Sequence, residues 1–388
     1  MGDAAELKRI ACDAIDSQAS RLRALSQDIW NHPELCFEEH YAHKRLTDFL
    51  EEQDFNVERS YKLETAFRAV PKHSRCKEED GYPNIAMLCE YDALPGIGHA
   101  CGHNLIAMVG VALRLVSKQL SNRLHFKAGL TVLGTPAEEG GGGKVELIDA
   151  GAFEDIDLAI IAHPAQINLP MPIVLARKGL KITYKGKASH ASGAPWNGVN
   201  ALDAAVQCYT NISHLRQQMK PTWRVHGVIT DGGVKPNIIP DQAELQYYLR
   251  APTDAELSVL CQKVEFKSEP VPYSSLLANK ILASLYVENG EATGIQFETN
   301  QEIIQRPGGS TDMGNVSKVV PSLYPKYSIG TDASLHSKDF ASHAKTEMAE
   351  TLSFMTAKAL AMTAIDVLIT PGLPNKITEE FINSMKTE

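Results

Sequence analysis

Apolar residues in the first 162 positions follow two spacings that alternate along the chain. Three short apolar runs bounded by turn residues predict strands buried on both faces, over 84–89, 128–133 and 158–162. Apolar residues three and four positions apart predict helices over 7–29, 38–52, 104–120 and 144–150. Strands that alternate with helices predict an α/β domain with a mainly parallel sheet.

The pattern changes near residue 176, where apolar and polar residues begin to alternate as in half-exposed strands. We predict strands over 178–187, 222–230, 238–250 and 264–267, with helices over 198–219 and 253–263. These segments predict a small antiparallel sheet with helices on one face. Helices near 274–289 and 341–368 then return to the first domain, so residues 176–270 are expected to be inserted between residues 1–175 and 271–388.

Composition narrows the class of protein. Of 388 residues, 44% are hydrophobic and 22% charged, which is typical of globular proteins and excludes a collagen-like or disordered chain. With 38 basic and 47 acidic residues the net charge is −9, so we expect neither a nucleic-acid nor an anionic membrane partner. Seven irregularly spaced cysteines favour reduced thiols. Met1–Glu6 does not open a signal peptide and no uninterrupted apolar run reaches eighteen residues, so a cytoplasmic protein is expected.

Potential metal ligands follow each of the three predicted strands. Because the carboxyl ends of parallel strands meet at one edge of an open α/β sheet, these side chains are expected to converge there. Thiolate, imidazole and carboxylate are the donors that zinc or another late first-row divalent ion prefers. A lone histidine or cysteine is more often structural, so the convergence is what favours a metal site. The residues concerned are Asp92, Cys101, His103, Glu138, Glu139 and His163.

Two other kinds of active site do not fit the motifs. The Gly140–Gly143 run is similar to a phosphate-binding loop, but Lys144 is followed by Val145 rather than by Ser or Thr. The carboxylates of Glu138 and Glu139 would also repel a phosphate. The chain has no Gly-x-Ser-x-Gly motif, which argues against a serine hydrolase.

Several continuous motifs resemble one known superfamily, that of the dinuclear metallohydrolases that includes aminoacylases, carnosinases and glutamate carboxypeptidases. The similarity extends over roughly residues 15–370, and the Cys-Gly-His form of the turn at Cys101 is typical of the amidohydrolase branch. Within that branch, Glu90–Asn104 and Lys235–Thr253 are most similar to the β-alanyl-lysine (Xaa-Arg) dipeptidase group. The motifs are Glu90–Pro95, Ala100–Asn104, Pro136–Gly140, Lys187–Ala191, Pro236–Pro240 and Gly309–Asp312.

The resemblance implies a zinc-peptidase-like catalytic domain with an inserted α+β lid that pairs two subunits into a homodimer. It also implies two divalent metal ions per subunit, zinc or manganese. Glu138 is similar to the family's general base, and Asp92 to a residue that orients a metal ligand. The implied metal ligands are Cys101, His103, Glu139, His163 and His336.

Three lid residues also match positions with a role in the family. His190 is similar to the residue that reaches a neighbouring subunit's active site and stabilises the tetrahedral oxyanion. Asn237 and Arg250 match positions that hold the substrate's carboxylate, and a guanidinium can bond both oxygens of a carboxylate at once. From the residues alone, Arg250 could equally form a surface ion pair on the lid.

The chain departs from the family pattern in two places. Where better-known peptidase members have His-x-Asp, this chain has Glu90-Tyr91-Asp92, so the assignment of each ligand to one of the two ions stays open. The lid is also short near 260–269, where relatives have a longer helix and a fuller last strand.

The resemblance implies metal-dependent hydrolysis of the peptide bond in dipeptides, such as β-alanyl dipeptides with a C-terminal Lys, Orn or Arg. One alternative is an amidohydrolase that acts on aminobenzoyl-glutamate or on an N-acyl amino acid. The other is a non-catalytic binding or regulatory homologue with a truncated lid. Because Glu138 and all five implied ligands are present, an enzyme is the expected outcome.

Overall fold

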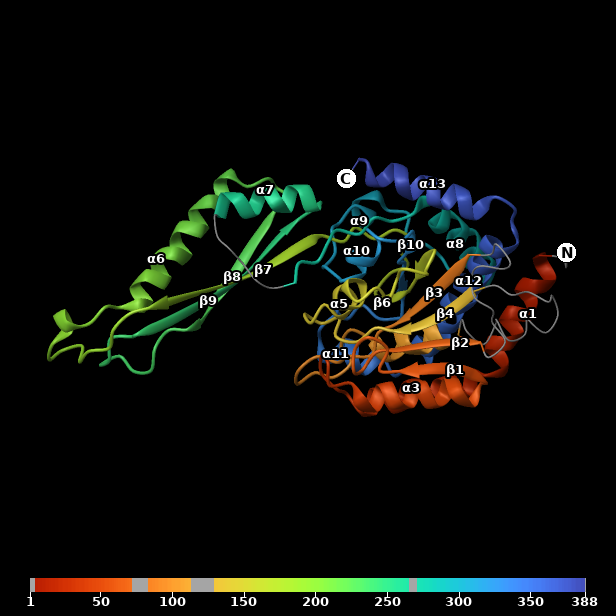
Figure 1. The fold of residues 1–388 in the computed structure, drawn as a ribbon, viewed down its shortest axis with the longest axis horizontal. Helices are drawn as coiled ribbons and strands as arrows, with labels where there is room; N and C mark the ends of the chain where they lie inside the picture. The colour runs from red at the N-terminus through yellow and green to blue at the C-terminus, as the bar shows by residue number, and fades with distance from the viewer. Residues whose placement is uncertain (1–3, 72–82, 113–128, 265–270, 388) are drawn as a thin grey trace. The chain divides into compact units, whose positions relative to one another are not determined.

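The structure is a computed structural model that describes residues 4–71, 83–112, 129–264 and 271–387. The chain forms two compact units (Figure 1). The large unit contains the residues up to Ile173 together with Leu276–Thr387, and the small unit contains Val174–Ser275. The chain therefore leaves the large unit once, builds the small unit and returns.

A six-stranded sheet forms the centre of the large unit, in the order β1-β2-β4-β3-β5-β10. The neighbours β4, β3, β5 and β10 run parallel, whereas β1, β2 and β4 pair antiparallel. This arrangement confirms the predicted mainly parallel α/β fold. The strands are β1 (Phe55–Arg59), β2 (Phe67–Pro71), β3 (Asn84–Cys89), β4 (Gly129–Gly134), β5 (Leu158–Ile160) and β10 (Ser322–Leu323).

The hairpin of β1 and β2 was not predicted from the sequence. In β1 only Phe55 is buried, and the charged residues Glu58 and Arg59 follow it, so the apolar pattern of a strand is nearly absent. Both strands are instead stabilised by pairing with each other and by packing against α3 (His40–Glu52). These contacts are non-local, and a single-sequence pattern does not contain them.

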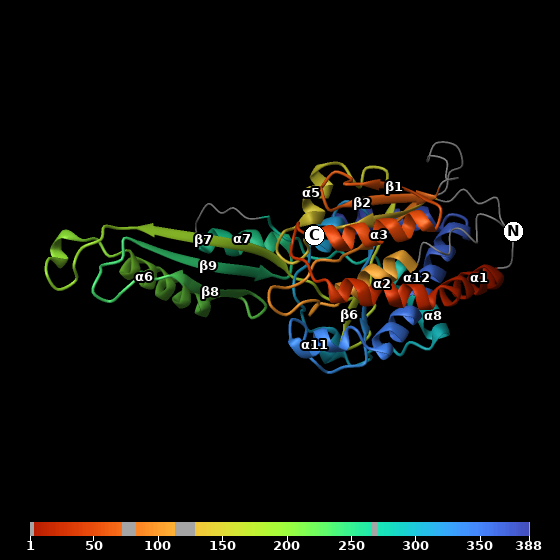
Figure 2. The same cartoon turned by 90° about the horizontal axis from the view of Figure 1, so that it is seen from below.

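Helices surround this sheet, and α12 packs against both α1 and α8 (Figure 2). The predicted helix over 7–29 is two helices, α1 and α2, because Gln18 leaves the helical region with φ −108° and ψ 4°. The predicted helix over 104–120 is described as His103–Ala112, and the rest lies outside the described residues, as does residue 128. The others are α1 (Ala4–Ser17), α2 (Ala19–Asn31), α5 (Gly143–Asp149), α8 (Lys280–Thr293), α9 (Gln301–Ile304), α10 (Met313–Val316), α11 (Lys338–His343), α12 (Glu347–Ile369) and α13 (Leu373–Met385).

Among the described residues, α12 alone is long and apolar enough to cross a membrane by length and composition. However, 72% of its most apolar window is buried inside the protein. Its side chains Phe354, Leu360 and Ile365 belong to the core that α1, α8 and the sheet share. The apolar character of α12 is thus accounted for by its central place in the large unit.

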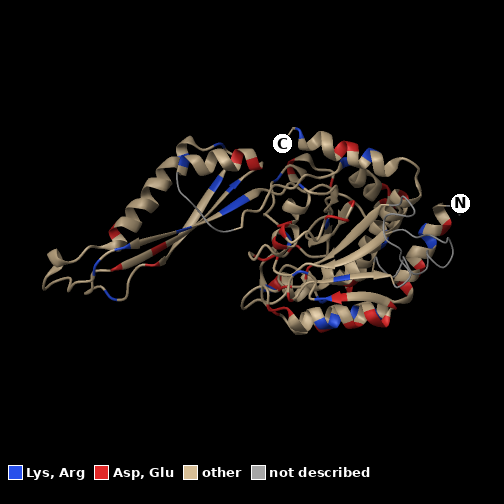
Figure 3. Ribbon diagram, in the orientation of Figure 1, with Lys and Arg blue, Asp and Glu red and all other residues tan. Residues whose placement is uncertain are grey.

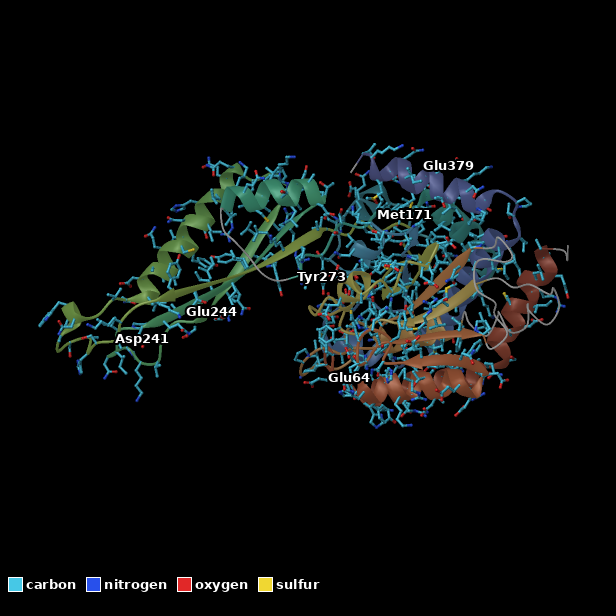
Figure 4. The ribbon with its side chains drawn as sticks, viewed as in Figure 1. Glu64, Met171, Asp241, Glu244, Tyr273 and Glu379 are labelled. Carbon is cyan, nitrogen blue, oxygen red and sulfur yellow. The ribbon has the colours of Figure 1, made fainter. Side chains whose placement is uncertain are left out.

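The small unit contains a three-stranded antiparallel sheet in the order β7-β9-β8, with apolar side chains on one face buried under two helices. On the opposite face Glu244 pairs with Lys181, and Figure 4 shows the Glu244 side chain on the side away from α6. The elements are β7 (Ala176–Lys185), η1 (Pro195–Asn197), α6 (Ala201–His214), η2 (Leu215–Gln218), β8 (Arg224–Asp231), β9 (Gln242–Ala251) and α7 (Asp254–Val264).

The end of the small unit differs from the prediction. Val264, expected to begin a strand over 264–267, is the last residue of α7, and 265–267 lie outside the described residues. The predicted shortening near 260–269 falls mostly in the same gap. Leu260 itself is buried in the core of the small unit. Another short parallel pair, β6 (His163–Ala165) with β11 (Lys326–Ser328), lies in the large unit.

Candidate metal centre

The strand ends of the large unit bring the predicted ligands together. Asp92 follows β3, and the turn after it places Cys101 just before the helix that begins at His103. Glu138 and Glu139 follow β4, and His163 is the first residue of β6. His336 precedes α11, and its backbone N–H donates a hydrogen bond to the Ala100 carbonyl (3.0 Å). This bond holds a C-terminal loop against the Cys101 turn.

The Asp92 carboxylate orients two of the predicted ligands at once. Its Oδ1 accepts a hydrogen bond from His103 Nδ1 (3.1 Å), and its Oδ2 accepts one from the backbone N–H of Glu139 (2.9 Å). Because Nδ1 of His103 is the donor, Nε2 is left to face the other predicted ligands. That atom is buried and has no hydrogen-bond partner among the described residues. A buried imidazole nitrogen without a partner is costly unless a ligand such as a metal ion binds it.

Cys101 and His163 form the second contact of the cluster. Cys101 Sγ lies 3.3 Å from His163 Nε2. The other ring nitrogen of His163, Nδ1, donates to the Pro164 carbonyl (2.7 Å), so Nε2 again faces the cluster. A backbone carbonyl that accepts from one nitrogen and leaves the other free is the usual support of a metal-binding histidine.

Glu139 and His336 form the third contact, with 3.3 Å between Glu139 Oε1 and His336 Nε2. The His336 side chain is 54% exposed and that of Glu139 only 11%, so His336 lies on the solvent side of the cluster. His336 has a φ of 62°, a conformation that non-glycine residues adopt rarely and often at functional sites. The strained backbone turns its ring toward Glu139.

The loop that carries Glu138 is similarly strained and supported. Ala137 has a φ of 59°, and its backbone N–H donates to the buried Glu39 carboxylate (2.9 Å). At the far end of the loop, a Cβ on Gly143 would lie 2.0 Å from the Pro136 carbonyl oxygen, so only glycine fits there. The loop is thereby held in one shape, with Glu138 and Glu139 both directed at the cluster.

Three overlapping groups of donor atoms result, each with its atoms within 4.8 Å of one another. The groups are Cys101 with His103 and His163, Cys101 with Glu139 and His336, and His103 with Glu138 and Glu139. All five predicted ligands and Glu138 are therefore brought together. The mixture of sulfur, nitrogen and oxygen donors fits divalent zinc or manganese.

Proton affinities in the cluster reflect burial and close charges. Burial, assisted by Glu139 and Glu90, raises the pKa of Glu138 well above its usual value. Burial also raises the pKa of Cys101 and lowers that of His163. Burial would raise the pKa of Asp92 too, but the charge and hydrogen bond of His103 outweigh it and lower that pKa to about 2. Asp92 is therefore an anion at any ordinary pH.

Of the three predicted residues of the small unit, two lie close together and the third is distant. His190 and Asn237 are neighbours, because the Ala191 N–H donates to the Asn237 carbonyl (3.0 Å) and His190 forms a β-bridge with Ile238. Both lie in loops beyond the end of the sheet at which Lys185 pairs with Gln242. Arg250 lies at the opposite end of β9, eight residues from Gln242. At about 3.3 Å per residue, that is a separation of about 26 Å.

Arg250 is part of a row of arginines. It pairs in register with Arg177 on β7 and Arg224 on β8. Figure 3 shows several Lys and Arg positions on these strands. The Nε of Arg250 donates to His226 Nε2 (3.3 Å), and burial together with the charge of Arg177 lowers the pKa of Arg250. This end of the sheet therefore carries three positively charged side chains in register.

Several polar residues around the cluster are not predicted from the sequence. From the sequence, Glu90 belongs to a family motif and marks a departure from the His-x-Asp pattern, and Lys144 belongs to an excluded phosphate loop, but neither is predicted to have a role in the site. Both are fully buried and form an ion pair, together with Asp312. The Cys36 thiol donates to the Glu139 carbonyl (3.1 Å). For Glu90 a signal was present, because it directly follows a buried strand at the ligand edge of the sheet.

Comparison with known proteins agrees with this geometry. Residues 176–272 match the peptidase dimerisation domain of the M20 family. The chain is 48% identical to the Xaa-Arg dipeptidase of Mus musculus, over 98% of this chain and 94% of that protein. It is 46% identical to the Xaa-Arg dipeptidase of Homo sapiens, over 98% and 93%. The chain belongs to the Xaa-Arg dipeptidase group of the M20 peptidase family.

Membership of the M20 family confirms the resemblance inferred from the motifs. The fold agrees as well: the crystal structure of a putative aminohydrolase from methicillin-resistant Staphylococcus aureus superimposes with a TM-score of 0.72 at 19% identity. The superposition covers 93% of this chain and 100% of that one. Both units of this M20 chain therefore have counterparts in one solved structure.

Replacing Cys101 with Ser should weaken metal binding, because a neutral hydroxyl takes the place of a thiolate. The loss is expected to be at least the roughly 10- to 100-fold that removal of a ligand's hydrogen-bond partner costs. Competition with a chromophoric chelator measures it. Cys12→Ser, a half-buried cysteine on α1, is the control and should bind metal as the unmodified protein does. Equal affinity in both variants would remove Cys101 from the ligand set.

Proposed function

We propose that this protein is a cytoplasmic, metal-dependent dipeptidase that cleaves β-alanyl and related dipeptides with a C-terminal Lys, Orn or Arg. The convergence of Cys101, His103, Glu139, His163 and His336 on one cluster carries the proposal. Full-length similarity to two Xaa-Arg dipeptidases supports a hydrolase of dipeptides. The cytoplasmic location is supported by the need to keep the Cys101 thiol reduced.

Two divalent ions, zinc or manganese, would be held by the five ligands and, when bound, would supply Lewis-acid activation of water and of the amide carbonyl. Glu138 acts as the general base. Its burial and the neighbouring carboxylates raise its pKa, which makes it a better proton acceptor than an ordinary glutamate. It takes the proton of the attacking water and passes it to the leaving amine, so the peptide C–N bond breaks without release of an anionic amine.

The hydrogen bonds of His190 leave its Nε2 as the ring nitrogen that can donate to an oxyanion. The Gly193 N–H donates to His190 Nδ1 (3.1 Å), so the ring proton is on Nε2, and the side chain is exposed. An N–H that points into a closed site can stabilise the tetrahedral oxyanion. Arg250 would bind the substrate's carboxylate with both guanidinium nitrogens, with Asn237 as a further polar contact.

A homodimer reconciles these roles with the distances inside the small unit. A dipeptide spans about 7 Å. Arg250 lies about 26 Å along β9 from the end of the sheet beyond which His190 lies, so the two side chains of one chain cannot both touch it. If His190 and Asn237 come from a second subunit, each site is complete. The edge strand β8 supports such pairing, because among the described strands only β9 pairs with it and its Val228 and Ile229 are exposed.

Substrate assays test the proposal directly. With zinc or manganese present, the protein should hydrolyse β-alanyl-lysine and dipeptides that end in Lys, Orn or Arg, and a strong chelator should abolish turnover. The panel should include p-aminobenzoyl-glutamate and an N-acetyl amino acid. Cleavage of these compounds without cleavage of dipeptides would favour the amidohydrolase alternative. Full turnover without metal would contradict the proposed chemistry altogether.

The two adjacent glutamates should behave differently. Glu138→Gln keeps the size of the side chain but cannot accept a proton, so turnover should fall by about 10²- to 10⁴-fold while metal content stays near normal. Glu139→Gln should instead lose metal, because an amide is a poor ligand. Steady-state kinetics and metal analysis on the same preparations separate the two. The reverse pattern would show that base and ligand had been exchanged.

Mixed dimers test the role of His190. His190→Ala subunits and Glu138→Gln subunits should each be nearly inactive alone, and mixing them should restore some activity. In a mixed dimer, one site has an intact base from its own chain and an intact His190 from the partner. Sedimentation comes first. A fully active monomer, or a dimer without complementation, would contradict this role of His190 in a neighbouring site.

A further inference from the structure

Three buried charged side chains beside the metal ligands have no part in the reaction proposed above. Glu90 follows β3, Lys144 lies in the first turn of α5, and Asp312 precedes α10, which packs against α5. All three side chains are fully buried. Lys144 Nζ lies 2.7 Å from Glu90 Oε1 and 2.6 Å from Asp312 Oδ1. One ammonium thus lies between two carboxylates.

The cluster is not electrically balanced. With all three groups ionised it carries a net charge of −1 in a place without solvent, where an uncompensated charge is costly. Asp312 is well satisfied, because it accepts from both the Nζ and the backbone N–H (3.0 Å) of Lys144. Glu90 has its Oε1 in an ion pair with Lys144, but neither of its carboxylate oxygens has a hydrogen-bond partner among the described residues. The excess negative charge therefore lies on the Glu90 side.

Glu90 Oε2 faces His103 Nε2, the buried ring nitrogen that has no hydrogen-bond partner among the described residues. It lies 3.6 Å from His103 Nε2, which is too far for a hydrogen bond. Two donors on one tetrahedral zinc ion, each about 2.0–2.2 Å from it, lie about 3.4 Å apart. The observed separation is thus close to that of two ligands of a common ion. A divalent cation between them would also compensate the excess charge.

We propose that Glu90 is a sixth metal ligand, which binds the same ion as His103, and that Lys144 and Asp312 are positioning residues that hold it there. The inference rests on the proposed metal centre and adds to it an acid outside the five-residue ligand set. Lys144 holds Glu90 Oε1, so that only Oε2 is available to the ion. Asp312 in turn holds Lys144 by two contacts, so the C-terminal part of the large unit helps to shape the site.

Glu90→Gln separates this role from a purely structural one. The amide keeps an oxygen for Lys144 and offers an N–H to His103 Nε2, while it removes the excess charge. We expect the affinity of one of two sites for Zn²⁺ or Mn²⁺ to fall 10- to 100-fold, measured by calorimetric titration of metal-free protein. The melting temperature of the metal-free variant should stay equal or rise. A Co²⁺-loaded sample should show an altered absorption spectrum.

Two matched variants serve as controls. Glu350→Gln replaces another buried glutamate, one that accepts from Gln27 and lies in α12, and should leave both metal affinities unchanged. Asp312→Asn also removes one negative charge from the cluster around Lys144, but it leaves the Glu90 carboxylate that faces His103 unchanged. Its effect on metal affinity should be smaller than that of Glu90→Gln, because Glu90 keeps its carboxylate.

The outcomes are distinct. If Glu90→Gln binds two ions as tightly as the unmodified protein, or if it only lowers the melting temperature of the metal-free form, Glu90 is a structural partner of Lys144 and this inference is wrong. If the unmodified protein binds no metal, the proposed function is wrong too. A selective loss of affinity at one site, with the metal-free fold intact, supports the inference.

Discussion

The carboxylate of Asp92 is the point on which the centre depends. One oxygen accepts from His103 Nδ1 and the other from the backbone N–H of Glu139, so a single side chain after β3 orients a predicted ligand on the following helix and a loop after β4. Parallel strands bring their carboxyl ends to one edge of the sheet, but they do not aim side chains. The two hydrogen bonds to Asp92 orient His103 and the Glu139 loop. The positive φ angles of Ala137 and His336 help to direct the neighbouring side chains to the same cluster.

Several acidic side chains are buried together near Asp92 in the large unit. Glu90, Glu138 and Glu139 all lie within 4.0 Å of His103 Nε2, and burial raises the pKa of both Glu138 and Cys101. Such a collection of acids is unfavourable by itself, and bound dications are the natural compensation. In the proposed reaction, the carboxylates that would bind the ions also raise the pKa of Glu138, the proposed base. Metal binding and catalysis would then depend on the same interactions.

The sequence was informative where local pattern and topology coincide. Buried strands, their order along the chain and the side chains that follow them were enough to predict the cluster of Cys101, His103, Glu139 and His163, and the motifs added His336. The hairpin β1–β2 could not be predicted because its stability comes from non-local pairing. The cluster of Glu90 and Lys144 could not be predicted because it also includes Asp312, more than 160 residues further along the chain. The separation of Arg250 from His190 likewise needs the register of β9.

Anomalous X-ray scattering from crystals grown with zinc, or with manganese, tests the central claim most directly, because it locates the ions independently of any assay. The account predicts two anomalous peaks in each subunit, both within the cluster formed by Cys101, His103, Glu139, His163 and His336. Crystals of active protein with no peak at this cluster, or with both ions bound elsewhere, would contradict it.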